Sequence, residues 1–329
     1  LRDALGSLRT GLASKAIDRY QVELISRAET LHLARPIFAL DEVLIDPRIL
    51  IPPPPTDPTQ SESLPTDSLS VVPNLPDLNF LSGVYAAHKL SIPDAMRDGA
   101  DLLLTGEPGS GRTTALAYLA IRLANRDKAM GSLIGKVPFL IHATDLAVNR
   151  TRDAIQPLIL AAQRTASAGV AAMLPGYIQK HLEQGNVMLL LDGLDEIPRA
   201  ELGPVAAWLT ALRAQHPGIR IVAAGSARGL GTLAQAGLAP VPIAPWTEYT
   251  QREFLAKWAR SWQQFVVPTI PKGRISDIDH SLINGWLAGT MRGRAPAEVT
   301  LRAWAAYAGD IRGQRSVDDL ESYAARMLS

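Results

Sequence analysis

The sequence of 329 residues contains no cysteine. This absence excludes disulfide bonds, thiol nucleophiles, iron–sulfur clusters and zinc sites with cysteine ligands. A chain without cysteine is compatible with any compartment, and a reducing cytoplasm is the easiest fit. We therefore expect a cytoplasmic protein whose chemistry depends on other side chains.

The sequence also lacks a large net charge and long apolar runs. Its 33 Lys and Arg residues balance 32 Asp and Glu residues, which gives a formal net charge of +1. No global field therefore favours a nucleic acid or an anionic membrane as a partner. The longest apolar stretches, such as 102–104 and 187–191, are much shorter than the roughly 20 residues of a membrane-spanning helix. We expect a soluble protein whose partner is neither a membrane nor a nucleic acid.

The overall composition is typical of folded domains. Hydrophobic residues make up 47% of the chain and charged residues 20%, which excludes disorder of the whole chain. The length favours two domains, or one large domain with appendages. Because the sequence begins with Leu, and because residues 1–18 lack the basic and then apolar order of a signal peptide, we interpret it as an internal fragment of a longer protein.

The first part of the chain divides into two segments. Residues 1–50 are predicted to be an N-terminal helical segment, with a helix over residues 11–33 followed by short extended pieces at 36–40 and 43–45. The apolar stripe of that helix is expected to contain Val22, Ile25, Ala28 and Leu31. Residues 51–77 hold eight of the 24 prolines and no Lys or Arg, which predicts a stiff Pro-rich linker. A ligand for an SH3-type domain is the alternative interpretation of this linker.

The second part of the chain, residues 78–245, alternates short apolar runs with helical patterns. The apolar runs are residues 101–105, 137–141, 187–191, 219–224 and 241–243. Runs without polar alternation suit strands that are buried on both faces, so the pattern predicts an α/β three-layer domain with a five-stranded parallel sheet. Residues 246–329 lose the strand pattern and are predicted to form a helical lid subdomain.

A glycine-rich loop follows the first of these predicted strands. Residues 106–113 match the phosphate-binding pattern G-x-x-x-x-G-K-[ST], except that Arg112 replaces the lysine. The backbone N–H groups of such a loop and the helix that follows it together surround a polyphosphate. The candidate nucleotide-binding residues are Gly106, Gly109, Ser110, Gly111, Arg112, Thr113 and Thr114. Thr113 is also a candidate ligand for Mg²⁺, and residues 78–245 are predicted to be a P-loop NTPase core.

Arg112 changes the expectation for catalysis. A lysine ammonium is a compact charge, whereas the guanidinium is planar, bulkier and permanently charged. It binds phosphate well, but in a different geometry. We therefore expect nucleotide binding to survive the replacement better than fast hydrolysis does.

Acidic residues follow the third predicted strand. Asp192 comes directly after the apolar run 187–191, at the edge of the sheet where open α/β folds bind ligands, and is a candidate magnesium ligand. Asp195 and Glu196 lie on the loop that leaves this strand and are candidates to orient or deprotonate an attacking water. The fourth strand leads to Arg228, which is either a sensor of the γ-phosphate or a solvated surface arginine.

The six histidines carry no metal-site pattern. They have no spacing that is typical of metal ligands, and each is interpreted as a structural or surface residue. They are His32, His88, His142, His181, His216 and His280.

These motifs together resemble the NACHT group of STAND nucleotide-triphosphatases. The resemblance rests on residues 106–113, the Asp-Gly-Leu-Asp-Glu at 192–196, the arginine after the fourth strand and the segment 243–255, and it covers roughly residues 78–262. It implies an ATP/ADP switch in a larger signalling protein, such as a prokaryotic defence protein. In that group an ADP-bound closed form opens, exchanges to ATP and self-associates through the NTPase core, which brings together effector domains outside this fragment.

Two alternatives remain open from the sequence. The first is a catalytically degenerate interaction scaffold that holds nucleotide only structurally. The second is an AAA+-type ATPase that depends on nucleic acid. For the switch, the resemblance implies ATP or ADP and Mg²⁺ as cofactors, with weak hydrolysis because of Arg112.

Overall fold

The computed structural model describes residues 18–51, 88–148, 153–226, 230–270, 279–291 and 293–328. Residues 52–77 of the predicted Pro-rich linker lie outside these ranges, so the prediction of a stiff spacer stays a prediction. The same holds for the boundaries of the four segments at residues 50, 77 and 245.

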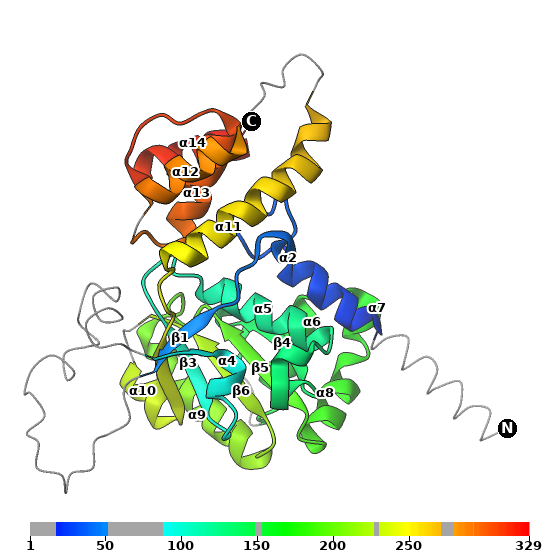
Figure 1. Ribbon diagram of the computed structural model, residues 1–329. Coiled ribbons are helices and arrows are strands. Elements are labelled where there is room, and N and C mark those ends of the chain that lie inside the picture. Colours follow the sequence, from blue (N-terminus) through cyan, green and yellow to red (C-terminus); the bar gives the residue numbers. More distant parts are fainter. Residues whose placement is uncertain are drawn as a thin grey trace, which may run out of the picture.

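The centre of the molecule is a five-stranded parallel sheet (Figure 1). Its strands are β3 (Asp101–Thr105), β4 (Val137–His142), β5 (Val187–Asp192), β6 (Arg220–Ala224) and β7 (Leu238–Pro242). They lie in the order β4-β5-β6-β3-β7, and every neighbouring pair is parallel. The predicted sheet is thus confirmed. Its last strand begins at Leu238, earlier than the predicted start at residue 241.

Proline marks both edges of this sheet. Pro138 lies in β4, and Pro240 and Pro242 lie in β7, and these strands occupy the two ends of the strand order. Proline has no N–H to donate to a neighbouring strand, so edge positions tolerate it. The three central strands are almost completely buried, as expected for aliphatic runs between two layers of helices.

Helices flank the sheet and confirm the α/β class. They are α5 (Arg112–Ala124), α6 (Gln156–Arg164), α7 (Ala168–Ala171), α8 (Leu174–Glu183), α9 (Arg199–Gln215) and α10 (Leu230–Gln235). Helix α5 follows the phosphate-loop motif and packs on β4, β5 and β6. Shorter elements are the helix α4 (Ile92–Ala95), the 3₁₀ turns Lys128–Leu133, Ala143–Asp145 and Val267–Thr269, and the π turn Trp262–Val266.

Within the described part of the N-terminal segment, residues 18–28 form a helix. The apolar stripe predicted for it is wrong at Val22, which is 65% exposed. The prediction of Ala28 is confirmed, and Tyr20 and Leu24 complete the buried face, because this four-residue spacing faces the sheet domain. The Tyr20 hydroxyl donates to the Pro138 carbonyl at 2.8 Å, which fixes the helix beside β4.

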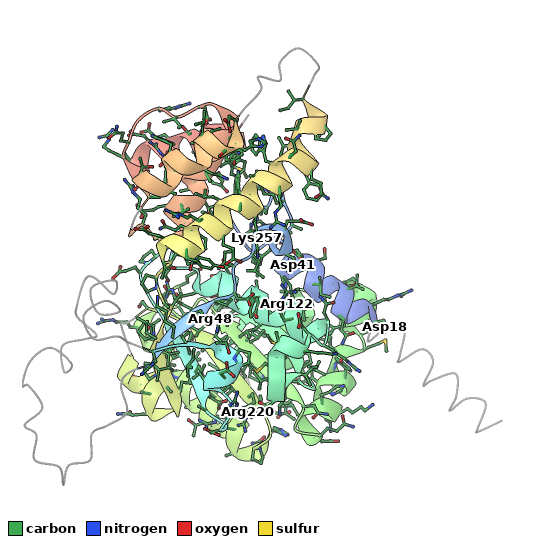
Figure 2. All side chains as sticks on the ribbon, in the orientation of Figure 1. Asp18, Asp41, Arg48, Arg122, Arg220 and Lys257 are labelled. Carbon is green, nitrogen blue, oxygen red and sulfur yellow. The ribbon has the colours of Figure 1, made fainter. Side chains whose placement is uncertain are left out.

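The chain then passes from the sheet domain to the lid. The predicted extended pieces at 36–40 and 43–45 are wrong in part, because residues 40–43 form the short helix α2 (Leu40–Val43). The strand β1 (Arg48–Ile51) follows and pairs antiparallel with β2 (His88–Ser91). We call residues 31–48 the strap. Asp41 in the strap pairs with Arg122 of α5, Nη2 to Oδ1 2.8 Å (Figure 2).

The lid lies above the sheet domain in the view of Figure 1, and its described part contains four α-helices. These are α11 (Glu248–Ser261), α12 (His280–Thr290), α13 (Pro296–Ala308) and α14 (Ser316–Leu328). They enclose their own buried cluster, which the strap enters through Phe38. The rings of Phe38 and Trp258 meet edge to face, with centroids 5.0 Å apart. The predicted helical lid is therefore present, and the strap is part of its core.

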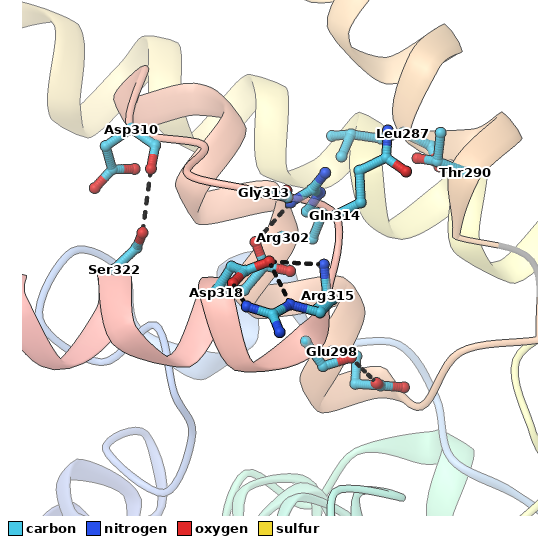
Figure 3. A network of polar contacts seen from close by, with 12 residues as sticks. Leu287, Thr290, Glu298, Arg302, Asp310, Gly313, Gln314, Arg315, Asp318 and Ser322 are labelled. Carbon is cyan, nitrogen blue, oxygen red and sulfur yellow. Dashed lines mark hydrogen bonds and ion pairs between the residues drawn. The ribbon is translucent and has the colours of Figure 1, made fainter.

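A polar network joins α13 to α14 (Figure 3). The Arg302 side chain is almost fully buried, and its Nη1 lies 2.9 Å from Asp319 Oδ1. The same guanidinium donates to the Gly313 carbonyl in the connecting turn. Arg315 pairs with Asp318, Nη2 to Oδ1 2.8 Å. A buried charge is tolerated only when it is paired and hydrogen-bonded, so this network fixes how α14 lies on α13.

Two candidate features are absent from the described ranges. No helix among these residues is both long and apolar enough to cross a membrane. No group of three or more acidic or histidine side chains there has the arrangement of a metal cluster.

Candidate nucleotide-binding site

The glycine-rich loop lies where the sequence predicts it, between β3 and α5. Gly109 has φ +83° and Gly111, the N-cap of α5, has φ +97°. Side chains other than glycine rarely adopt this left-handed conformation, so both glycines are required by the turn. A Cβ on Gly106 would lie 2.5 Å from Ser110 Oγ, which shows how tightly the loop closes on itself.

Two polar atoms of this loop are buried without a hydrogen-bond partner. They are Ser110 Oγ and Arg112 Nη1, and neither has a partner within the described part of the chain. Buried polar groups in folded proteins nearly always have a partner. A hydroxyl and a guanidinium nitrogen left open in a loop at a helix N-terminus fit an anion such as a phosphate group. The residues present therefore fit the polyphosphate of a nucleotide.

Arg112 makes one strong contact within the site. Its Nη2 lies 2.9 Å from Asp195 Oδ2, and the two side chains are 13% and 31% exposed. The pair thus joins the P-loop to the acidic loop after β5. Two of the predicted site residues, Arg112 and Asp195, are therefore in direct contact, a pairing that sequence reasoning did not predict.

Thr113 and Asp192 form a second contact between the same two loops. The Thr113 side chain hydrogen-bonds the Asp192 carboxylate at the end of β5. Burial raises the pKa of Asp192, and the hydrogen bonds from Thr113 and from the Gly193 backbone partly oppose this rise. A hydroxyl and a carboxylate are oxygen ligands of the kind that Mg²⁺ prefers. The two predicted metal ligands therefore lie together.

His142 lies beside the acidic loop, a placement that sequence reasoning did not predict. Its Nε2 lies 3.5 Å from Glu196 Oε2, and its Nδ1 is 2.7 Å from Thr144 Oγ1. The ring lies so close to Gly193 that a Cβ there would be 2.3 Å from His142 Nε2. The interpretation of this histidine as a structural or surface residue stays a prediction, and only its placement was missed. The signal was its position directly after the run 137–141, because parallel strands end at one edge of the sheet.

A cavity of about 770 Å³ opens beside the P-loop. It lies within the size range of about 300–1,000 Å³ that is typical of ligand sites. Its walls come from the P-loop and α5, the segment before α11 and α11 itself, the strap, β2 and α13. They are residues 109–115, 243–247, 249, 250, 253 and 254, parts of the strap between 31 and 48, Lys89, Pro296, Ala297 and Thr300. The sheet domain, the strap and the lid therefore all contribute to one cavity.

The lid touches the P-loop directly. The Ala297 backbone N–H at the start of α13 donates to the Gly109 carbonyl at 3.1 Å. A Cβ on Gly109 would lie 2.9 Å from the Ala297 Cβ. The position of α13 therefore depends on the conformation of the loop. Arg228, the candidate sensor of the γ-phosphate, lies outside the described residues.

Comparison with known families identifies this arrangement. Residues 101–261 match the model of the NACHT domain. The chain contains a NACHT domain. In the structure this NACHT domain extends from the first residue of β3 to the last residue of α11. It includes the P-loop, the acidic loop and the first lid helix, and it makes up nearly half of the chain.

Similarity to solved structures is weak. The chain is similar to PCH-2 of C. elegans (TM-score 0.37, 13% identity, 78% of this chain and 67% of that chain). It is similar to the Aeropyrum pernix ORC1 protein in complex with DNA (TM-score 0.37, 17% identity, 76% of this chain and 63% of that chain). It is also similar to Drosophila ORC bound to DNA (TM-score 0.34, 14% identity, 76% of this chain and 60% of that chain). The chain thus spans 60% to 67% of the length of these chains. No curated protein matches the sequence significantly.

Proposed function

We propose that this NACHT domain binds ATP and ADP with Mg²⁺ and acts as a nucleotide-controlled switch in a larger signalling protein. The observation that carries the proposal is the pair of unpartnered buried atoms, Ser110 Oγ and Arg112 Nη1, in a glycine loop that opens on a cavity of about 770 Å³. The absence of cysteine supports a cytoplasmic setting, because a reducing cytoplasm is the easiest fit for such a chain.

Each residue has a proposed role. The backbone of residues 109–111 and the side chains of Ser110 and Arg112 hold the phosphates. Thr113 and Asp192 hold Mg²⁺, whose charge would offset that of the phosphate oxygens. Glu196 and Asp195 are assigned to the attacking water, and Arg228 to the γ-phosphate. Because Arg112 replaces the lysine, we propose that hydrolysis is slow.

The shared cavity supports the switch. A ligand in it lies against the P-loop, the strap and the first turn of α13, since all three contribute to its walls. The diphosphate and the triphosphate are expected to contact the lid differently. Each nucleotide therefore shifts the equilibrium between two lid positions by the difference in its binding free energy for those two positions. We propose that the ADP form is closed, and that the ATP form opens and self-associates through the NTPase core.

The test compares the two nucleotides on the nucleotide-stripped chain. Limited proteolysis and sedimentation velocity with Mg-ATP and with Mg-ADP should give different cleavage patterns in the lid and a larger species with ATP. Binding without any such difference would favour the scaffold that holds nucleotide structurally. Stimulation of hydrolysis by DNA or RNA, with a steep dependence on salt, would favour the nucleic-acid-dependent ATPase instead.

A further inference from the structure

The two terminal nitrogens of the Arg112 guanidinium differ in their hydrogen-bond partners. Nη2 is 2.9 Å from Asp195 Oδ2, whereas Nη1 is buried and has no partner among the described residues. The Arg112 side chain is only 13% exposed, so this pair is not a loose ion pair on the surface. One end of the guanidinium is held in place, and the other end is left for a ligand.

We infer that Asp195 is a positioning residue for Arg112. It holds Nη2 and thereby presents Nη1 to a phosphate group, so that Arg112 and Asp195 act as a matched pair. The inference rests on the proposed nucleotide binding. It assigns Asp195 a second task besides its proposed role toward the attacking water, and it gives a physical reason for an arginine at this position of the loop.

The geometry of the two cationic side chains supports this assignment. The guanidinium fork donates from two nitrogens at fixed separation, so a carboxylate and a phosphate bind to different atoms. A lysine has one nitrogen. If that nitrogen bound both anions, the carboxylate and the phosphate would be brought together and would repel each other. With lysine in the loop, Asp195 is therefore a competitor of the phosphate rather than a support.

The neighbouring carboxylate has a separate partner. Glu196 Oε2 lies 3.5 Å from His142 Nε2, on the side of β4, whereas Asp195 faces the P-loop through Arg112. The two consecutive acidic residues are thus held by basic side chains from different elements. Glu196 remains the group available to a water molecule, and it provides a matched control for Asp195.

A double-mutant cycle tests the pair. The dissociation constants of Mg-ADP and Mg-ATP are measured by calorimetry for the parent, Arg112→Lys, Asp195→Asn and the double variant. We expect Asp195→Asn to weaken binding in the parent and to strengthen it in the Arg112→Lys background. The change in dissociation constant caused by Asp195→Asn should differ by about tenfold between the two backgrounds, which is what the loss of one hydrogen bond to a charged group produces. The general repulsion between Asp195 and phosphate is present in both backgrounds, so it cancels in the cycle.

The control is the same cycle with Glu196→Gln, which removes an equal charge one residue away. Its effect on binding should be the same in both backgrounds. Asp195→Glu, which keeps the carboxylate, should restore part of the affinity that Asp195→Asn loses. Thermal unfolding of every variant establishes that it is folded before its affinity is compared.

The outcomes separate the two proposals. A parent that binds nucleotide, with equal effects of Asp195→Asn in both backgrounds, would overturn the matched pair and leave the proposed function standing. An equally strong dependence on background for Glu196→Gln would also overturn it, because the effect would then be one of net charge. A folded parent that binds neither nucleotide would overturn the proposed function, and the inference with it.

Discussion

The two buried clusters of this molecule are built from different side chains. The cluster around the sheet is mainly aliphatic and includes Leu102, Leu103, Leu104, Leu189, Leu190 and Val222. The lid cluster is built around large rings, namely Phe38, Phe254, Trp258, Trp262, Trp304 and Tyr307. Parallel strands that are buried on both faces need compact aliphatic side chains. Helices that cross at a few points leave wider gaps, which rings fill.

The cavity lies at a junction of two separately packed bodies. The strap is common to both, since its Leu40 and Leu44 belong to the sheet cluster and its Ala34, Phe38 and Val43 belong to the lid cluster. The P-loop supplies the phosphate end of the cavity from the sheet side, and α13 reaches it from the lid side. Perturbing one cluster should therefore leave the other intact, whereas perturbing the junction should disturb both.

The largest expected effect comes from the lid cluster. Trp258 is fully buried, and Trp258→Ala should destabilise the lid by about 3–5 kcal/mol. Hydrogen exchange should show that amides of α11 to α13 lose protection while those of β5 and β6 keep it. The control is Tyr249→Ala on the same helix. Tyr249 is 78% exposed, so this change should alter the free energy of unfolding by less than about 0.5 kcal/mol. Equal loss of protection in the sheet strands would show that the two clusters are one cooperative unit.

A smaller effect is expected at the junction. Gly109→Ala introduces a Cβ 2.9 Å from the Ala297 Cβ at a residue with φ +83°, which should cost about 1–2 kcal/mol. Hydrogen exchange should increase both in the P-loop and in the first turn of α13. Gly135→Ala is the matched control, because its added Cβ meets no atom within 4 Å and its φ is not in the left-handed range. Unchanged hydrogen exchange in the first turn of α13 of the Gly109→Ala variant would contradict the proposed coupling between loop and lid.

The smallest effect concerns pH and the strap. Burial lowers the pKa of His32 to about 4, and its Nε2 lies 3.1 Å from the Phe38 carbonyl oxygen. In the unfolded chain this pKa is about 6.5. The unfolded state therefore takes up a proton at a higher pH than the folded state does, so stability is complete above pH 6.5 and falls progressively toward pH 4. Denaturant unfolding at pH 7.5 and pH 5 should show a smaller loss for His32→Gln than for the parent. If the parent and His32→Gln lost the same stability between pH 7.5 and pH 5, His32 would be as readily protonated in the folded chain as in the unfolded chain.

The sheet domain was predictable from the sequence. For the lid, only its helical character was predictable. The five strands follow from local apolar runs, and the phosphate loop from a motif of adjacent residues. The face of the helix at 18–28, with Tyr20 and Leu24 buried and Val22 exposed, depends on what the helix packs against. A pattern of three- and four-residue spacings does not decide between neighbouring faces.

The contacts across the site were not predictable for the same reason. Arg112 and Asp195, like His142 and Glu196, are far apart in the sequence and meet only because three strands end at one edge. The strap gave no motif, although it forms one wall of the cavity. Its role follows from tertiary packing of Phe38 and Asp41, neither of which stands out from its neighbours in the sequence.

The cavity between sheet, strap and lid is proposed to bind a Mg-nucleotide through the P-loop. The most direct test is calorimetric titration of ATP and ADP into the nucleotide-stripped chain, with and without Mg²⁺. We expect binding that weakens without Mg²⁺ and is lost in Thr113→Ala and Asp192→Ala, while Thr210→Ala on the exposed face of α9 binds as the parent does. Absence of binding by the folded parent, or equal binding by all four proteins, would contradict it.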